Sequence, residues 1–389
     1  MRALTAPDRT PAVGRPTARG RWIWTVSGLV TVAALCVPVS LIITKQAHDG
    51  GGVNMVAPPN RVVTVTATVT SLSVASYGSP IQVTTGPVRH VIVRESISYD
   101  QGGGPSPTVT DQVSDGRLTL AAPACATSDC SVGFTVTVPS SVPVTANSDG
   151  APIVVADAAG ASLDSGGGNV QASRIDGPLS ISAQGGSITV AHVTSPTGTN
   201  LDSGGGPVTA SQISGPLTVS GEGGSVTVGN ISSLTGTDLD SGGGPINASG
   251  IDGPLTATAE GGSVTVNGLT GDLQTDTGGG PFTGESVAAA KASVIAEGGA
   301  VGLTLRTAPA YVFVGTGGGP ATLTFNRAPT TVTVNTEGGS ATLNVPGGPY
   351  SVSADSEGGS QTVEVLTAPG AQRSLAVSTG GGPLEIVPR

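Results

Sequence analysis

The fold of this chain is decided by stretches such as Asp240–Val266, which reads D-S-G-G-G-P-I-N-A-S-G-I-D-G-P-L-T-A-T-A-E-G-G-S-V-T-V. Glycine-rich corners separate short runs in which branched apolar residues alternate with Ser, Thr or Asn. Period-two alternation of this kind is typical of β-strands that bury one face and expose the other. Because the density of glycine also disfavours a helix, the stretch predicts short strands joined by tight corners.

The glycine corners return about every 19 residues from Gly150 to Gly382. Corners that read D-[ST]-G-G-G alternate with corners that read [QE]-G-G-S, and like corners are 38 residues apart, as from Gly168 to Gly206. A fixed period of this length is the mark of a solenoid, in which each repeat buries its apolar side against its neighbours. The second glycines of the corners are Gly168, Gly186, Gly206, Gly224, Gly244, Gly262, Gly280, Gly299, Gly319, Gly339, Gly359 and Gly382.

We therefore predict an all-β fold, a parallel β-solenoid of about 12 coils over residues 146–389. We expect the corner glycines to supply positive φ and the prolines that follow to fix φ. The alternative is a radial or sandwich arrangement of hairpins. Hairpins favour two-residue turns such as Asn-Gly, whereas these corners are Gly-Gly-Ser and Gly-Gly-Pro, so the solenoid is favoured.

The N-terminal part of the sequence predicts a membrane anchor. Residues 22–44 carry no charge and are long enough for a transmembrane helix, with Trp22 and Trp24 as interfacial anchors. Residues 1–21 contain five arginines and one acid, Asp8, which predicts a basic cytoplasmic tail. Residues 45–60 read as a stalk linker. A cleaved signal peptide is the alternative; in either case the repeats are expected outside the cell.

Residues 61–145 are less repetitive and are expected to form a β cap on the first coil, since a bare terminal coil exposes strand edges. Alternation predicts strands over Arg61–Ser73, Ile81–Thr85, His90–Ser98, Arg117–Ala121 and Gly133–Val138. Within this region Cys125 and Cys130 are a candidate disulfide in an oxidising exterior. Two unrelated free thiols are the alternative.

The charge balance argues against a nucleic-acid ligand. The whole chain has a formal net charge of −10, and the part after Lys45 has 10 basic and 25 acidic residues, with Lys291 as its one lysine. Nucleic acids require clustered cations along the bound phosphates. The acidic repeats therefore predict another class of partner.

Residues that could carry chemistry are scattered. His48, His90 and His192 fall in the stalk, the cap and the repeats, so neither a zinc cluster nor a Ser-His-Asp triad is expected. No glycine triplet is followed by the Gly-Lys-Ser/Thr of a phosphate loop. The corner acids are solvated charges, with weak calcium binding as the alternative. These are Asp164, Asp202, Asp240, Asp276, Glu222, Glu260, Glu297, Glu337 and Glu357. We expect no enzyme activity and no cofactor.

A succession of segments leads into the repeats: D-G-R-L-T-L-A-A-P (Asp115–Pro123), the cysteine pair, F-T-V-T-V-P (Phe134–Pro139) and V-P-V-T-A-N-S-D-G (Val142–Gly150). This order resembles the bacterial putative-adhesin domain family, a domain of unknown function in surface proteins of high-GC Gram-positive bacteria. The resemblance covers residues 61–389. It implies a β-solenoid on the cell surface and carries over no catalytic residues.

These observations predict a single-pass plasma-membrane protein, with its N-terminus cytoplasmic and its repeats extracellular, that displays a non-catalytic solenoid. An adhesin-like or cell-envelope role is expected, with a cell-wall glycan or an extracellular protein as ligand on the Ser/Thr-rich outer faces. The alternative is an envelope-stress sensor or regulator whose solenoid is the sensory ectodomain.

Overall fold

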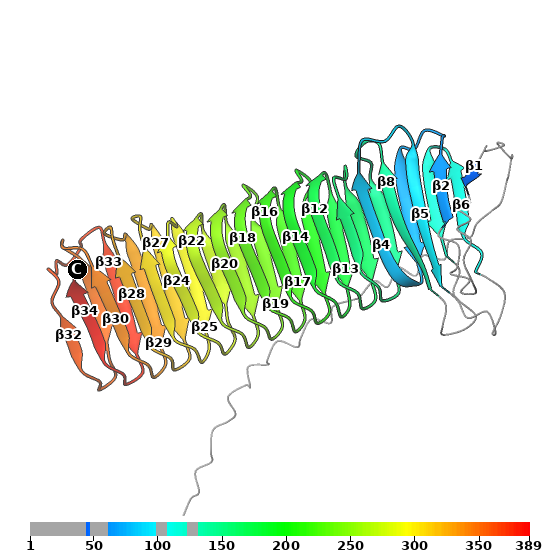
Figure 1. The fold of residues 1–389 in the computed structure, drawn as a ribbon. Helices are drawn as coiled ribbons and strands as arrows, with labels where there is room; N and C mark the ends of the chain where they lie inside the picture. Colours follow the sequence, from blue (N-terminus) through cyan, green and yellow to red (C-terminus); the bar gives the residue numbers. More distant parts are fainter. Residues whose placement is uncertain (1–43, 47–60, 99–106, 123–130) are drawn as a thin grey trace, which may run out of the picture. The chain divides into compact units, whose positions relative to one another are not determined.

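The computed structural model describes residues 44–46, 61–98, 107–122 and 131–389, which form two long β-sheets facing each other across one core (Figure 1). Sheet A contains β1 (Thr44–Gln46), β2 (Arg61–Val65), β4 (Gly78–Thr85), β5 (Val91–Ser98), β8 (Ser131–Val138), β10 (Ile153–Ala156), β12 (Val170–Asp176), β14 (Ile188–Thr194), β16 (Val208–Ser214), β18 (Val226–Ser232), β20 (Ile246–Asp252), β22 (Val264–Thr270), β24 (Phe282–Val287), β26 (Val301–Leu305), β28 (Ala321–Phe325), β30 (Ala341–Val345), β32 (Gln361–Val363) and β34 (Leu384–Pro388). Sheet B contains β3 (Ser71–Ser76), β6 (Thr110–Ser114), β7 (Arg117–Ala121), β9 (Val144–Ser148), β11 (Ala161–Ser165), β13 (Leu179–Ala183), β15 (Thr199–Ser203), β17 (Leu217–Gly221), β19 (Thr237–Ser241), β21 (Leu255–Ala259), β23 (Leu273–Asp276), β25 (Lys291–Ala296), β27 (Tyr311–Thr316), β29 (Thr331–Thr336), β31 (Ser351–Asp355) and β33 (Ser374–Thr379).

Each coil of the chain is one sheet B strand followed by one sheet A strand. In sheet A, Val170 pairs with Ile188, Ile188 with Val208, and Val208 with Val226. Shorter coils therefore alternate with longer ones, and one of each makes up the double repeat of the sequence. All these pairings are parallel. Because the strand pairs from β11/β12 to β33/β34 number 12, the predicted parallel solenoid of about 12 coils is confirmed, and the hairpin alternative is wrong.

The core lies between the two sheets and is built by the alternation seen in the sequence. In β13 the burial pattern alternates strictly, with Leu179 and Ile181 almost fully buried. Equivalent residues of the next coils pair in register above and below, so Val, Ile, Leu and Ala form continuous ladders along the stack. Each coil buries its apolar side only against its neighbours, as expected for a solenoid.

The second glycines of the corners form a ladder of close backbone contacts. A Cβ on any of them would lie 2.0–2.4 Å from the carbonyl oxygen of the equivalent corner residue one coil away; at Gly244 the contact is with Gly224 at 2.2 Å. None of these second glycines has positive φ. Positive φ falls instead on an earlier glycine of several corners, at Gly278, Gly318, Gly358 and Gly381, so the expectation is correct for those corner glycines and not for the second ones. The second glycines are required because the corners of successive coils approach too closely for any side chain.

Buried hydroxyl groups fix the same corners. The side chain that precedes many of the corner glycines points inward and donates a hydrogen bond to the carbonyl oxygen of the glycine three positions later. Ser203 Oγ donates to Gly206 O at 2.7 Å, and Thr336 Oγ1 donates to Gly339 O at 2.6 Å. Both hydroxyl-bearing residues are 0% exposed. These bonds satisfy backbone acceptors at corners that would otherwise be buried and unpaired.

At the N-terminal end the coil order departs from the sequence order. Strands β3 and β4 pair with β9 and β10 on one side and with β7 and β8 on the other, all in parallel. Sheet A then continues through β5, β2 and β1 in antiparallel pairs, and sheet B ends in the antiparallel pair β6–β7. The single strand expected over Arg61–Ser73 is wrong: the chain leaves β2 in sheet A and enters β3 in sheet B.

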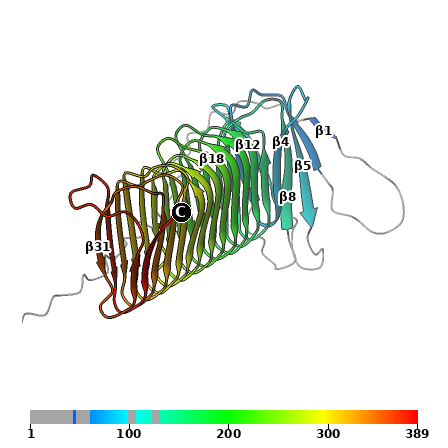
Figure 2. The same ribbon diagram turned by 90° about the vertical axis from the view of Figure 1, so that its left-hand side faces the viewer.

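The C-terminal end shows a similar inversion. Strands β33 and β34 lie between β29/β30 and β31/β32, although they come last in the sequence. Figure 2 shows β31 at the end of the stack, with the chain's C-terminus one coil further in. The C-terminal coil is therefore covered by the coil that precedes it in the sequence.

Several predicted features lie outside the described residues. These are the tail over residues 1–21, nearly all of the transmembrane helix over residues 22–44, most of the stalk over residues 45–60, His48 and the cysteine pair Cys125 and Cys130. Within the part of the chain that the structure describes, no helix is long and apolar enough to cross a membrane.

Candidate functional site

A column of residues in the left-handed conformation runs along the outer face of sheet A. Its members have φ between 52° and 73° and occupy equivalent places in successive coils. They are Asp157, Arg174, His192, Gln212, Asn230, Gly250, Gly268 and Ser286. We call this set the αL column.

The αL column arises because each strand carries one extra outward-facing residue. In β12, Ser173 pairs with Ala191 and Ile175 pairs with Val193, while Arg174 between them is left out of the register. Ser173 and Arg174 both face outward, and Ile175 returns to the core at 1% exposed. Because the neighbouring strands have this extra residue at the same place, the register between coils is kept, and each strand turns at its left-handed residue. Repeated coil after coil, this turn folds the outer face of sheet A into a groove.

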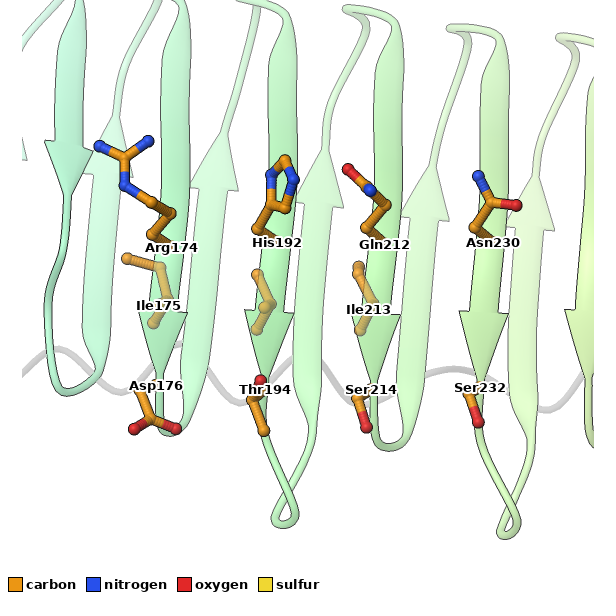
Figure 3. A pocket seen from close by; sticks show the side chains of 11 residues that line it. Arg174, Ile175, Asp176, His192, Thr194, Gln212, Ile213, Ser214, Asn230 and Ser232 are labelled. Carbon is orange, nitrogen blue, oxygen red and sulfur yellow. The ribbon is translucent and has the colours of Figure 1, made fainter.

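The groove has two polar rows, as Figure 3 shows, and a volume of about 540 Å³. One row belongs to the αL column and consists of Arg174, His192, Gln212 and Asn230; the other, two residues later in each strand, consists of Asp176, Thr194, Ser214 and Ser232. Buried Ile175, Val193 and Ile213 separate the rows. Coils are ~4.8 Å apart, so four coils present donors and acceptors over roughly 14 Å.

An ion pair closes one end of the groove. Arg174 donates from Nε to Asp157 Oδ1 at 2.5 Å and from Nη2 to Oδ2 at 3.0 Å. This bidentate hydrogen bonding lowers the pKa of Asp157 below its ordinary value and raises the pKa of Arg174. A second hollow of about 340 Å³ shares Arg174 and Asp176 and continues past Asp157 to Thr85 of β4. The groove therefore extends toward the N-terminal strands.

The side chains of the αL column occupy a backbone conformation that favours glycine. For L-residues the left-handed region costs about 1 kcal/mol or more. The same column accepts glycine at Gly250 and Gly268, so the fold does not require a side chain there. Four consecutive coils nevertheless carry Arg174, His192, Gln212 and Asn230. Strain retained where the fold does not need it points to use of these side chains.

The predicted acids lie apart from this groove. Asp164, Asp202, Asp240 and Asp276 form one column on the outer face of sheet B, alternating with Ser182, Ser220 and Thr258. Like acids are thus two coils apart, about 10 Å. The corner glutamates Glu222, Glu260, Glu297, Glu337 and Glu357 lie in the turns after sheet B strands. Among the described residues, no three His, Cys, Asp or Glu side chains gather closely enough to hold a metal ion.

Sequence reasoning treated the histidines as scattered and so missed the groove. His90 lies before β5, but His192 lies in the αL column beside Arg174 and Gln212. A signal was present: each of these residues follows a second corner glycine by six positions, as His192 follows Gly186 and Gln212 follows Gly206. Aligning the repeats on that glycine places unlike polar residues in one column.

Comparisons with known proteins add little to this geometry. No protein-family model matches the chain, and no curated protein matches it. The solved structures that match include a putative adhesin from Bacteroides fragilis, at 11% identity, covering 84% of this chain and 97% of that one. They also include a putative cell adhesion protein from Clostridium sporogenes, at 8% identity, covering 84% of this chain and 98% of that one. Both have a TM-score of 0.20, too low to bear on function. Membership of the putative-adhesin domain family therefore stays a prediction.

Proposed function

We propose that this chain is a non-catalytic, adhesin-like binding protein of the cell envelope, and that the groove along the αL column holds its ligand. The observation that carries the proposal is the strained polar row of Arg174, His192, Gln212 and Asn230, where glycine would serve the fold. We propose a linear, hydroxyl-rich glycan lying across successive coils as the ligand.

The shape of the groove supports a long ligand. It is open to solvent and crosses β12, β14, β16 and β18, whereas sites for small molecules are typically concave and enclose most of the ligand. Each coil offers one donor or acceptor from each row. A sugar ring in an extended glycan advances by a distance similar to the spacing between coils, so one ring can meet one coil.

The chemistry of the groove favours a glycan over other polymers. A peptide that adds a strand needs an open sheet edge, but β12, β14, β16 and β18 are paired on both sides. Arg174 is the one Arg or Lys among the lining residues, and it is already paired with Asp157. This suits a hydroxylated ligand better than a polyphosphate. Because no Phe, Tyr or Trp side chain lines the groove, each contact is modest and several must act together.

The experiment is a sedimentation assay of the purified full chain with insoluble peptidoglycan sacculi. The test variant is His192→Gly with Gln212→Gly, which removes two side chains but keeps a residue that the αL column already accepts at Gly250. We expect binding to fall at least about tenfold, the effect of losing two or three hydrogen bonds of ~0.5–1.5 kcal/mol each. The unfolding temperature should stay equal or rise.

The matched control is Asn200→Ala, an exposed amide on the outer face of sheet B. It should bind like the wild type. Equal binding of the wild type, the groove variant and the control would show that the groove is not the site. No retention of the wild type on sacculi would refute peptidoglycan as the ligand.

We also propose that residues 22–43 anchor the chain in the plasma membrane with the repeats outside, since Thr44, the last residue of the expected helix, belongs to β1. The absence of charge over residues 22–44 and the arginines before them support this topology. Mild protease treatment of intact cells should release the repeats and leave the N-terminal tail protected. Repeats that are cut only after lysis would contradict surface display.

A further inference from the structure

The C-terminal coil fills a slot whose two walls are in the same register. Ser374 of β33 pairs with Thr331 of β29 and with Ser351 of β31. In sheet A, Leu384 of β34 pairs with Ala341 of β30 and with Gln361 of β32. We call the space between β29/β30 and β31/β32 the C-terminal slot, and residues 374–389 the donor segment.

The strands on the two sides of the slot are as far apart in sequence as strands that pair directly elsewhere in the solenoid. In sheet B, Tyr311 pairs with Thr331, and the sequence interval between them is repeated from Thr331 to Ser351. In sheet A, Ala321 pairs with Ala341, and the same interval leads on to Gln361. Strands β31 and β32 could therefore stack on β29 and β30 in register, and the donor segment lies wedged between them.

Apolar side chains explain why the donor segment takes the inner place. Leu375, Val377, Leu384 and Ile386 are at most 2% exposed, whereas Val352, Ala354 and Val363 of the outer coil are only partly buried. Burial of apolar area is the main favourable term in folding. Backbone bonds run to both walls: Ser374 N donates to Thr330 O at 2.8 Å, and Leu384 N to Ser360 O at 2.8 Å.

The connection that allows this order is short and mostly exposed, with Val365 as its one buried residue. It runs from Glu364 to Arg373, contains Pro369 and Gly370, and leaves Leu366 67% exposed. The outer coil that precedes it has one strand neighbour in each sheet, and β32 is itself very short. Segments with few neighbours open at low free-energy cost. The outer coil can therefore open at low cost and give the donor segment, which pairs with strands on both sides, a way out of the slot.

We infer that the C-terminal slot accepts the donor segment of a second copy of this chain, giving a dimer by reciprocal exchange. A terminal segment held by a short hinge in a slot of identical chemistry loses no contact when two chains trade it. Two solenoids are then joined at their C-terminal ends. With the proposed anchor at the other end of the sequence, this dimer suits contact between facing surfaces. The inference does not depend on the groove or its ligand.

A cross-linking experiment tests the exchange. Thr342 and Glu385 are register partners on the outer face of sheet A. Two full-length chains with different tags, one with Thr342→Cys and the other with Glu385→Cys, are made with Cys36, Cys125 and Cys130 changed to serine. They are unfolded, mixed, refolded and oxidised. We expect a disulfide-linked species that carries both tags and has twice the monomer mass.

The matched control replaces Thr342→Cys by Thr322→Cys, one coil further from the slot in the same column. That cysteine lies about 10 Å from position 385, beyond the ~7 Å between Cα atoms that a disulfide spans. It should give no linked species. A chain with both Thr342→Cys and Glu385→Cys should close internally when monomeric.

Two outcomes overturn the inference. Internal closure of the double variant with no mixed-tag species, in a sample that is monomeric by light scattering, would mean that each slot accepts only its own segment. Failure of the double variant to close in any form would mean that the donor segment does not occupy the slot.

Discussion

The interior coils and the C-terminal coils use the same corner but differ in how they are ordered. From Gly186 to Gly339 each corner glycine lies against the preceding one in the sequence. At the end, Gly382 lies against Gly339, and Gly359 lies against Gly382. The glycine ladder thus continues through the inversion unbroken. The corner specifies that coils stack, and the apolar content of each coil decides which coil lies inside.

The largest expected effect comes from blocking the glycine ladder in the interior. Gly244→Ala places a Cβ 2.2 Å from the carbonyl oxygen of Gly224, and the coils on both sides prevent relief. We expect a loss of about 3 kcal/mol or more in the free energy of unfolding. Urea unfolding followed by circular dichroism measures it.

Two further alanine variants compare the loss of stability at Gly244 with the loss at an open corner position and in the outer C-terminal coil. Gly243→Ala, whose Cβ meets nothing within 4 Å, should change stability by less than about 0.5 kcal/mol. Gly359→Ala, in the outer coil, should cost only about 1 kcal/mol because that coil can shift outward. Equal losses at Gly244 and Gly359 would show that the ends are as rigid as the interior.

The second effect tests the inverted order directly. Val377→Ala removes two carbons from the inner coil, where the side chain is 2% exposed. At ~0.8 kcal/mol per carbon plus a cavity term, we expect a loss of about 2 kcal/mol. Val352→Ala, the same change in the partly buried outer coil, should cost about 0.5 kcal/mol. If the coils stacked in sequence order, the ranking of the two unfolding free energies would reverse.

Most of the interior could be predicted from sequence, because one local pattern repeats and each coil meets only its neighbours. Asp240–Val266 alone shows the strands, the corners and the inward residues, and the acids of sheet B lie two coils apart as their spacing in the sequence implies. The end could not be predicted in this way. The interval from Thr331 to Ser351 indicates sequential stacking, whereas the observed order depends on competition between two coils for one buried place.

The groove could be predicted in part, less fully than the interior coils but more fully than the order of the C-terminal coils. Its periodicity is visible in the sequence, since Arg174, His192, Gln212 and Asn230 each follow a second corner glycine by six positions. Its left-handed backbone is hard to see, because Arg and Gln are not among the residue types enriched at positive φ. The position of these residues in the repeat therefore indicates the groove, whereas their residue types do not.

A third and smaller effect concerns buried hydroxyl groups inside the stack. Thr336 donates to Gly339 O at 2.6 Å, so Thr336→Val leaves a corner carbonyl without that bond and should cost about 1–2 kcal/mol. The hydroxyl of Thr237 is buried with no hydrogen-bond partner among the described residues. Thr237→Val should therefore be neutral or stabilising. Equal losses in thermal unfolding would contradict the assignment of the hydroxyl to the corner.

The smallest effect lies where the N-terminal strands meet the interior coils, at the ion pair of Asp157 and Arg174. Hydrogen bonding from Arg174 lowers the pKa of Asp157 in the folded chain, so the unfolded chain takes up this proton at higher pH. The stabilisation is therefore fully present above the ordinary Asp pKa of about 3.9 and is lost as the pH falls through the lowered value.

A double-mutant cycle of Asp157→Asn and Arg174→Gln, with the unfolding temperature measured against pH, isolates the coupling free energy between the two side chains. Both side chains are substantially exposed, at 34% and 58%, so the coupling should be small at neutral pH and weaken further in high salt. A coupling that grew as the pH fell below about 3.9 would contradict the sign of the pKa shift.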